Sequence, residues 1–451
     1  MAPDQPADRP PDDPPDLRCD LSGGRPDGRD DVLSSEGGAG LSSGPRDDEP
    51  ADDLASELPG GRSAGPPVVP PADPAQVPAA ALTSLRRSPL HARHVAAGAK
   101  LAGFGGWEMP LEYGGGGVLA EHLAVRTAVG LFDVSHLGTV GVRGPGTRAH
   151  LDAVLSNDLG RIGPGRSQYT LCCDEAGGIV DDLLAYVLAE DEVLLIPNAA
   201  NAPAVLDRLR ADLPTAVEVT DRHAEVAVLA VQGPRSDQVL AAVGLPAGHP
   251  YGSFVVEGPV TVCRTGYTGE RGYELLVSAA GAGELWDSLV AAVLAAGGRR
   301  AGLGARDTLR TEMGFPLHGA DIGPDVTPVQ ARLGWAVGWA KPAFTGRDAL
   351  VAAKAAPADR RLWGLRAVGR GIPRPGMVVS APGAGTGETA DPPAGGRVTS
   401  GTFSPTLRTG IALALLDARI TVGQQVSVSV RGRPELFEVV RPPFVPNRTL
   451  A

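Results

Sequence analysis

The alternation of hydrophobic and polar positions divides this chain of 451 residues into three regions. Residues 1–80 contain no Phe, Trp or Tyr and are rich in Pro, Asp, Gly and Ser. Such a segment cannot bury enough apolar area to offset the entropy lost on ordering, so we expect a disordered tail over residues 1–86. Apolar runs with helical or strand periodicity follow the tail, and from about residue 360 only short strand-like runs remain.

The middle region alternates strand-like with helix-like segments. Its pattern predicts strands over residues 130–136, 168–173, 179–187, 192–197, 226–231, 260–264 and 272–277, and helices over 118–129, 203–212, 281–296 and 305–313. Residues 103–110 are interpreted as a glycine-rich loop, and Asn201 as the residue that caps the helix over 203–212.

The C-terminal region predicts a small all-β domain. Its β-like runs lie at residues 363–367, 397–402, 410–416, 425–430 and 436–440. The segment 380–396 is rich in Pro, Gly, Ala and Thr without an apolar pattern, which predicts a mobile loop. The predicted fold class is therefore α+β, with a mixed body over residues 87–350 and an all-β domain over 358–447.

The formal net charge of −11 is located in the N-terminal tail. Residues 1–80 hold 17 acidic residues and six arginines, and the rest of the chain has 35 residues of each sign. A neutral body without a basic run argues against nucleic acid as a partner. No stretch of about 18 apolar residues is present, so we expect no membrane span.

The cysteines favour a reduced, cytoplasmic setting. Cys19, Cys172, Cys173 and Cys263 form no CxxC pair, which does not suggest a disulfide framework. Cys172 and Cys173 are neighbours on a predicted strand and point to opposite faces, so we expect no metal shared between them. The sequence has no H-E-x-x-H or P-loop motif, and its two G-x-S-x-G matches, at residues 40–44 and 61–65, lie in the predicted disordered tail, without the strand-to-helix turn of a nucleophile elbow. The sequence therefore does not favour the common hydrolase classes that carry these motifs.

Two adjacent aspartates lie inside an apolar run that follows the predicted turn at residues 174–178. Because strand side chains alternate, Asp182, Leu184 and Tyr186 share one face, and Asp181 takes the other. A buried ionised carboxylate is costly unless a partner pairs with it. The alternation alone leaves open which of the two carboxylates faces a pocket.

Other polar groups stand in apolar surroundings. Glu274 lies within an apolar strand, although an exposed strand residue is an equal interpretation. Arg306 lies near the start of a helix, where a cation opposes the helix dipole and needs an anion from a carboxylate or a ligand. Arg310 is interpreted as a surface partner of Asp307 or Glu312.

The histidines have two interpretations as well. His136, shortly after Asp133, suits a general base, but we favour a structural histidine with satisfied hydrogen bonds. His122 is interpreted as a surface or packing residue on its helix. Together with the aromatic residues, the carboxylates and arginine suit a flat heteroaromatic ligand, because a glutamate can accept two hydrogen bonds from an amino-pyrimidine edge. A pterin has such an edge.

Six ordered segments resemble the aminomethyltransferase (T-protein) family of the glycine cleavage system. They are FGGWEMP at 104–110, FDVSH at 132–136, GGIVDDL at 177–183, RTGYTG at 264–269, GLGARD at 302–307 and TSGTFSPT at 399–406. The resemblance extends over about residues 88–447. It implies a three-domain, cloverleaf-like arrangement, with two mixed α/β folate-binding domains and a C-terminal β-barrel-like domain.

The resemblance also implies an activity and its residues. The enzyme would transfer the methylene of an aminomethyl group, carried on the lipoyl arm of the H-protein, to tetrahydrofolate with release of ammonia, and would need no metal. Asp182 matches the catalytic aspartate, and Glu274 the residue that holds the pterin edge. The remaining matches to the folate pocket are Tyr169, Tyr186, Asn198, Tyr267, Arg306 and Phe315. Phe315 departs from some relatives, which have tyrosine there.

Two alternatives share the resemblance. One is a folate-dependent demethylase of a small methylated substrate, which the retained segments at 266–269 and 304–307 disfavour without excluding. The other is a non-catalytic folate-binding protein of iron–sulfur assembly. Such proteins resemble one another in a Lys-Gly-Cys-x-x-Gly-Gln-Glu segment, and the comparable region here reads His-Gly-Ala-Asp-Ile at residues 318–322.

Overall fold

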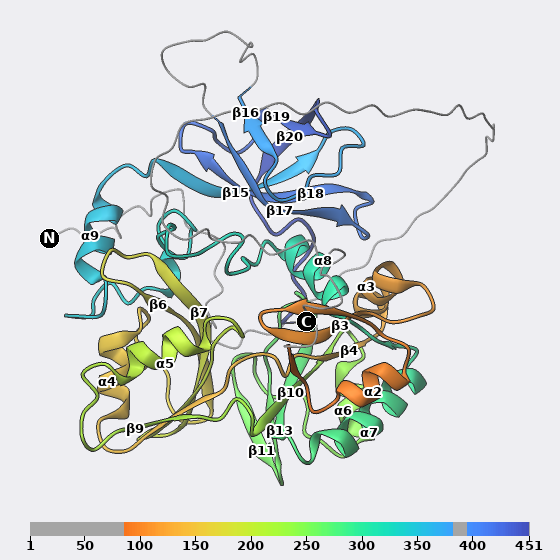
Figure 1. Ribbon diagram of the computed structural model, residues 1–451, viewed down its shortest axis with the longest axis vertical. Coiled ribbons are helices and arrows are strands. Elements are labelled where there is room, and N and C mark those ends of the chain that lie inside the picture. Colours follow the sequence, from red (N-terminus) through yellow and green to blue (C-terminus); the bar gives the residue numbers. More distant parts are fainter. Residues whose placement is uncertain (1–84, 382–394, 451) are drawn as a thin grey trace, which may run out of the picture. The chain divides into compact units, whose positions relative to one another are not determined.

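The computed structural model describes residues 85–381 and 395–450 (Figure 1). The predicted tail therefore lies outside the described residues except for its last two positions, and so does most of the predicted loop 380–396. Arg86, the last residue of the predicted tail, belongs instead to strand β1 (Arg86–Arg87).

A six-stranded sheet forms the first structural layer. Its strand order is β11-β12-β13-β10-β4-β14. The strands are β4 (Gly130–Asp133), β10 (Val226–Gln232), β11 (Phe254–Glu257), β12 (Val260–Cys263), β13 (Gly272–Ser278) and β14 (Arg299–Arg300). Helix α7 (Ala282–Ala295) contributes Trp286 and Leu289, and α6 (Ser236–Ala242) contributes Leu240, to the core on one face of this sheet. That face includes Tyr273 and Leu275 of β13.

A five-stranded sheet forms the second layer, with strand order β6-β7-β8-β5-β9. The strands are β5 (Val140–Arg143), β6 (Arg166–Cys173), β7 (Ile179–Ala189), β8 (Glu192–Ile196) and β9 (Glu218–Asp221). Helices α4 (Thr147–Val154) and α5 (Ala202–Arg210) pack on one face, which takes Leu183, Ala185 and Val187 from β7. A single 3₁₀ turn follows α4 at Leu159–Arg161.

The opposite faces of the two sheets share one core cluster. Tyr186 of β7 packs in this cluster with Phe132 of β4 and Cys263 of β12, and helix α8 (Leu303–Met313) adds Ala305 and Leu309. Leu184 is packed against the same cluster. The predicted alternation along β7 is thus confirmed. The face of β7 that carries Asp182 is the one turned toward the six-stranded sheet.

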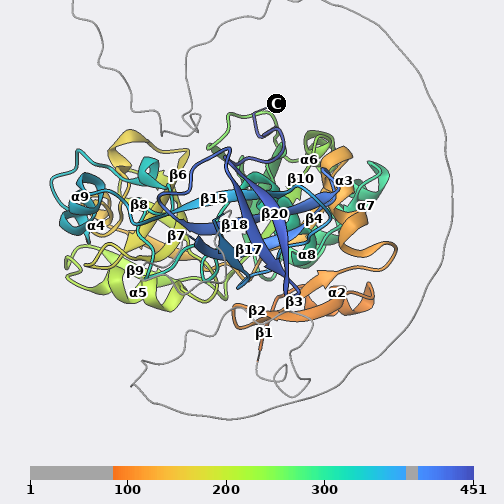
Figure 2. The same ribbon diagram turned by 90° about the horizontal axis from the view of Figure 1, so that it is seen from above.

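The C-terminal domain is a closed barrel, which confirms the all-β prediction and the α+β fold class (Figures 1 and 2). Its strand order is β15-β18-β17-β16-β19-β20. The strands are β15 (Arg360–Ala367), β16 (Val378–Ser380), β17 (Gly395–Ser404), β18 (Thr409–Asp417), β19 (Gln425–Val430) and β20 (Arg433–Val440). Helix α9 (Arg347–Ala355) and a 3₁₀ turn (Gly334–Ala336) precede the barrel.

The barrel is joined to α8 through buried polar contacts. Glu312 of α8 accepts hydrogen bonds from Ser404 Oγ and, at 2.9 Å, from Thr406 Oγ1. The same carboxylate accepts from Arg126 Nη2 at 2.8 Å on helix α3 (Gly117–Thr127). His122 is fully buried, and its Nε2 lies 3.3 Å from Glu312 Oε2. His122 is therefore a packing residue and not a surface residue.

The N-terminal segment corrects one prediction. Residues 103–110 do not form a loop: β2 (Lys100–Phe104) and β3 (Trp107–Glu112) make an antiparallel hairpin that pairs Phe104 with Trp107. The connecting Gly105 and Gly106 have φ of 55° and 84°, and two successive positive φ values are what a tight hairpin turn requires. Helix α2 (His91–Ala96) precedes this hairpin. Among the described residues, none of the helices has the length and apolar character that a bilayer crossing needs.

Candidate active site

The carboxylate of Asp182 accepts hydrogen bonds from two side chains, one on a neighbouring strand and one in the segment after another. Tyr169 of β6 donates its hydroxyl hydrogen to Asp182 Oδ2 at 2.9 Å. Asn198, two residues after the end of β8, donates from Nδ2 to Asp182 Oδ1 at 2.9 Å and to the Asp182 carbonyl at 3.0 Å. The carboxylate therefore has a fixed orientation on the face shared by the two sheets.

Asp181 lies on the opposite face of β7 and is fully buried. It accepts hydrogen bonds from the Asn198 backbone N–H at 2.9 Å, from Asn198 Nδ2 at 2.9 Å and from Asn201 Nδ2 at 2.6 Å. Asn201 precedes α5, but its side chain makes no capping hydrogen bond to the helix. The predicted capping role of this side chain is wrong, because the amide donates to the carboxylate instead.

The two aspartates share one electrostatic environment through Asn198. Burial is the largest cause that raises the pKa of each carboxyl, and the negative charge of Asp182 raises the pKa of Asp181 further. The hydrogen bonds from Tyr169 and Asn198 oppose this for Asp182. The pair therefore retains a proton to a higher pH than free carboxyls do, which suits a group that exchanges protons near neutrality.

Glu274 lies on β13, on the strand face that turns toward Asp182. Thr265 Oγ1 donates to Glu274 Oε2 at 2.6 Å, and the Tyr186 hydroxyl lies 3.1 Å from Thr265 Oγ1. The side chain of Glu274 is buried, so the exposed interpretation is wrong. Thr265 occupies one carboxylate oxygen, and within the described ranges Glu274 forms no salt bridge.

Arg306 is held by an aromatic ring and not by a carboxylate. Its guanidinium carbon lies 4.6 Å from the centroid of the Tyr267 ring, and no described residue forms a salt bridge with it. Burial lowers the pKa of Arg306, and the negative charge of Glu274 raises it. Tyr267 donates its hydroxyl to the Pro316 carbonyl, and its ring stacks on Phe315 at 5.6 Å and 26°.

These groups belong to one neighbourhood. The charge of Asp182 raises the pKa of Tyr267, that of Arg306 lowers it, and Glu274 acts on Arg306 in turn. Hydrogen bonds, ring contacts and charge effects thus link the eight residues that the sequence predicts for the site. They come from β6, β7, β13, the segment after β8, the turn before β13 and the α8 region: Asp182, Tyr169, Tyr186, Asn198, Tyr267, Glu274, Arg306 and Phe315.

The predicted pairing of Arg310 with Asp307 is confirmed, but its predicted surface position is wrong. It is a buried residue and not a surface one, with 3% of its area exposed. Its guanidinium pairs with Asp307 at 2.7 Å and with Asp321 at 2.7 Å, and donates to Ser400 Oγ of the barrel at 2.8 Å. Arg310 therefore joins α8 to the barrel, while Arg306, one turn earlier, has no carboxylate partner in the part of the chain that the structure describes.

Sequence reasoning missed three neighbours of the site. Trp335 stacks on Tyr169 with centroids 5.2 Å apart and is 38% exposed. His318 Nε2 lies 3.0 Å from the Ile179 carbonyl, and its charge lowers the pKa of Asp182. Thr265 positions Glu274. No local pattern marks the first two, because both reach the site from a long irregular segment between α8 and α9.

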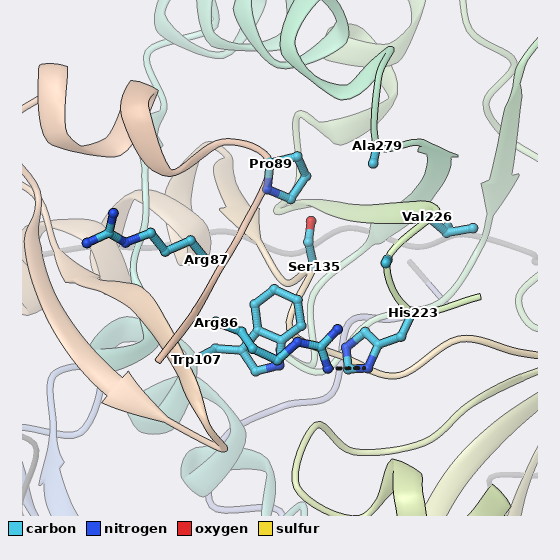
Figure 3. A pocket seen from close by; sticks show the side chains of 9 residues that line it. Arg86, Arg87, Pro89, Trp107, Ser135, His223, Val226 and Ala279 are labelled. Atoms are coloured by element: carbon cyan, nitrogen blue, oxygen red, sulfur yellow. Dashed lines mark hydrogen bonds between the residues drawn. The ribbon is translucent and has the colours of Figure 1, made fainter. Parts of the chain in front are cut away.

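A surface cavity lies elsewhere in the fold (Figure 3). It has a volume of about 370 Å³, and its lining residues are Arg86, Arg87, Pro89, Trp107, Ser135, His223, Ala224, Val226 and Ala279. It contains none of the predicted site residues. Across residues 85–381 and 395–450, no three His, Cys, Asp or Glu side chains are grouped to hold a metal ion.

Comparisons with known proteins cover most of the chain from residue 90 to residue 446. Residues 90–341 match the family model described as GCVT N-terminal domain, and residues 360–446 match the glycine cleavage T-protein C-terminal barrel domain. An aminomethyltransferase of Parafrankia sp. is 61% identical over 366 residues, which cover 80% of this chain and 98% of the relative. One of Mycobacterium avium is 55% identical over 371 residues, covering 81% and 98%.

A solved structure agrees with these matches. The crystal structure of glycine cleavage system aminomethyltransferase T from Bartonella henselae superposes with a TM-score of 0.76 at 34% identity, covering 82% of this chain and all of that chain. The resemblance carried by the six sequence segments is therefore confirmed. The chain belongs to the glycine cleavage T-protein family of aminomethyltransferases.

Proposed function

We propose that this aminomethyltransferase takes the aminomethyl group from the lipoyl arm of a glycine cleavage H-protein and delivers its methylene to tetrahydrofolate. The carbon–sulfur and carbon–nitrogen bonds of the aminomethyl group break, and bonds from the methylene to two folate nitrogens form. Ammonia and the dihydrolipoyl arm leave. The folate nitrogens lose two protons, which the released thiol and ammonia take up, so the enzyme must move protons between neighbouring atoms.

The observation that carries this proposal is the environment of Asp182. Tyr169 and Asn198 fix the carboxylate on the face that turns toward β13, and burial raises its pKa. A carboxyl in this state can accept a proton from a folate nitrogen and release it again near neutral pH. Its fixed orientation also supports a near-attack geometry between nitrogen and methylene carbon.

Glu274 and Arg306 supply the complementary polar groups. Thr265 uses one oxygen of Glu274, and the carboxylate can accept hydrogen bonds from the amino-pyrimidine edge of a pterin. Arg306 has no carboxylate partner among the described residues, so its guanidinium is available to a ligand oxygen. The Tyr267 and Phe315 rings supply apolar contacts for a planar ligand. The acceptor of Glu274, the donor of Arg306 and the two rings together fit tetrahydrofolate as a co-substrate.

We also propose a cytoplasmic location. The three cysteines within the described ranges, Cys172, Cys173 and Cys263, are free and buried. Free thiols are the ordinary state of cysteine in a reducing compartment.

The test of the proposal is ammonia release from aminomethylated H-protein, with and without tetrahydrofolate. We expect release by the purified full-length chain to depend strongly on folate and to form 5,10-methylenetetrahydrofolate in equal amount. Absence of folate-dependent release would contradict the proposal. Transfer of the methyl group of a methylated amine such as N-methylglycine to tetrahydrofolate, giving 5-methyltetrahydrofolate and the demethylated amine, without activity on the H-protein, would instead favour the demethylase alternative. Folate binding without any turnover would favour the iron–sulfur assembly alternative.

A further inference from the structure

His136 lies in a turn that joins the two sheets beside the candidate site. It follows β4 of the six-stranded sheet by three residues. Two residues later, Gly138 N–H donates to the Pro197 carbonyl at 2.8 Å, and Pro197 immediately precedes Asn198, which holds Asp182. The turn is therefore connected through the backbone to the residues that orient the catalytic carboxylate.

The imidazole of His136 is buried, and its Nδ1 has no hydrogen-bond partner among the described residues. The residue is 2% exposed, and its Nδ1 is buried with no partner. Within the described ranges the ring contacts Phe104 edge-on, with centroids 5.3 Å apart and planes at 88°, but no polar group pairs with Nδ1. Our interpretation of His136 as a satisfied structural histidine is therefore wrong. A buried polar side chain that the protein leaves unpaired calls for a ligand or a water as its partner.

The charges around His136 keep its ring neutral. Burial and the positive charge of Arg306 lower its pKa to about 3, and the negative charge of Asp133 opposes them only in part. Asp133 is engaged elsewhere, since His94 Nε2 lies 2.8 Å from its Oδ2. A ring that stays neutral at physiological pH does not act as a general acid, but it can donate or accept a hydrogen bond.

The backbone of His136 is anchored from the side of the surface cavity. His223 Nε2 lies 2.9 Å from the His136 carbonyl, and Arg86 Nη1 lies 3.3 Å from His223 Nδ1 (Figure 3). Because a guanidinium only donates, Nδ1 of His223 is the acceptor and Nε2–H donates to the carbonyl. Arg86 itself stacks over Trp107 at 4.3 Å. These contacts fix the backbone of His136, and none of them involves a nitrogen of its ring.

The positive charge of Arg306 acts on the His136 ring, so the two side chains share one electrostatic environment. Arg306 is the largest cause, after burial, that lowers the pKa of His136. Arg306 also shares its environment with Glu274 and Tyr267. The unpaired Nδ1 of His136 thus lies in the electrostatic environment of the guanidinium that also acts with Glu274 and Tyr267.

We propose that His136 is a ligand-binding residue of this site, whose neutral imidazole forms a hydrogen bond with the pterin-bearing substrate beside Glu274 and Arg306. This inference rests on the proposed function, because it takes tetrahydrofolate as the ligand. The hydrogen bond orients the substrate, and proton movement remains with Asp182.

Three variants at one position test the proposal. His136→Phe keeps an aromatic ring against Phe104 and removes both nitrogens. His136→Asn places an amide near the position of Nδ1, and His136→Gln places one near Nε2. The probe is 5-formyltetrahydrofolate, a stable tetrahydrofolate derivative, with its Kd measured by calorimetry on the full-length chain. We expect the Phe variant to raise Kd about tenfold or more, and one of the two amide variants to restore it to within about threefold of wild type.

His249→Phe is the matched control. Both ring nitrogens of His249 are also buried without partners, but its ring contacts Tyr273, on the opposite face of β13 from Glu274. We expect this variant to leave Kd unchanged. A pH profile of turnover between pH 6 and 9 should keep its shape in the active amide variant, because a neutral ring does not titrate there.

The outcomes separate this inference from the proposed function. If wild type does not bind the probe, the proposed function fails. If wild type binds it, Glu274→Gln weakens binding and His136→Phe does not, only the role of His136 is overturned. Should all three His136 variants lose binding and thermal stability together, with no rescue by an amide, the ring is structural and the inference is likewise overturned.

Discussion

Glu274→Gln is the substitution that separates folate binding from folding most cleanly. Glutamine keeps the volume of the side chain and an oxygen that can accept the hydrogen bond from Thr265, 2.6 Å away. It removes the negative charge that the bound pterin edge would meet. Since no described residue forms a salt bridge with Glu274, the substitution leaves no buried protein cation unpaired.

The size of the effect follows from the kind of hydrogen bond that is lost. Hydrogen bonds to a charged group contribute about 1.5–3 kcal/mol, which corresponds to an increase in Kd of about 10- to 150-fold at 25 °C. The assay is calorimetric titration with 5-formyltetrahydrofolate, paired with thermal unfolding. We expect a weaker Kd and a melting temperature close to that of wild type.

Glu270→Gln is the control for this experiment. Glu270 is another buried glutamate, but its Oε1 pairs with Arg126 at 3.0 Å within the structural network of α3. Glu270→Gln should lower the melting temperature and leave Kd for folate unchanged. A wild-type Kd for Glu274→Gln would refute the assignment of Glu274 to the pterin edge, and so would equal losses of binding in both variants.

Two further predictions concern the buried charges. Burial raises the pKa of Asp182 in the folded chain, so its contribution to stability is present below its unfolded pKa and is lost as pH rises through the folded one. Asp182→Asn should therefore gain stability relative to wild type as pH rises above the unfolded pKa of about 4, and a denaturant-unfolding difference that stays flat with pH would contradict this. Arg126, His122 and Ser404 lower the pKa of Glu312 to about 2, so its contribution is present above about pH 4.5 and lost as pH falls through 2. Glu312→Ala should cost about 3–5 kcal/mol of unfolding free energy at pH 7, because it leaves Arg126 partly unpaired, and a loss below about 1 kcal/mol would show that the network carries little stability.

The periodic parts of the fold were predictable from the chain alone. The alternation along β7 placed Asp182 with Tyr186 and Asp181 opposite them, and the core clusters confirm that division. The apolar run around Glu274 predicted the central strand β13 in the same way. Such elements are specified locally, because the position of each residue in the repeat determines which face of the strand its side chain occupies.

What could not be predicted depends on partners distant in sequence. The two-residue strands β1 and β14 exist only because β3 and β4 offer them an edge. Arg310 looked like a surface residue because its carboxylate partner Asp321 and the hydroxyl of Ser400 come from other segments. The side chain of Asn201 serves Asp181 rather than its own helix for the same reason.

The candidate site shows both situations. Two aspartates in an apolar run were visible in the sequence, but the choice of Asp182 required the family resemblance in addition to the alternation. The missing hydrogen bond of His136 had no signature in the sequence, because any histidine after a strand could have found a partner. Only the packing around its ring shows that it found none.

The most direct test of the central claim is ammonia release by Asp182→Asn. Asparagine keeps an oxygen that can accept from the Tyr169 hydroxyl, which lies 2.9 Å from the carboxylate, and removes the group that exchanges protons. With aminomethylated H-protein and saturating tetrahydrofolate, we predict a fall in kcat of about 100-fold or more, with Kd for 5-formyltetrahydrofolate within about threefold of wild type. Wild-type kcat in this variant would contradict the assignment of Asp182 as the catalytic carboxylate.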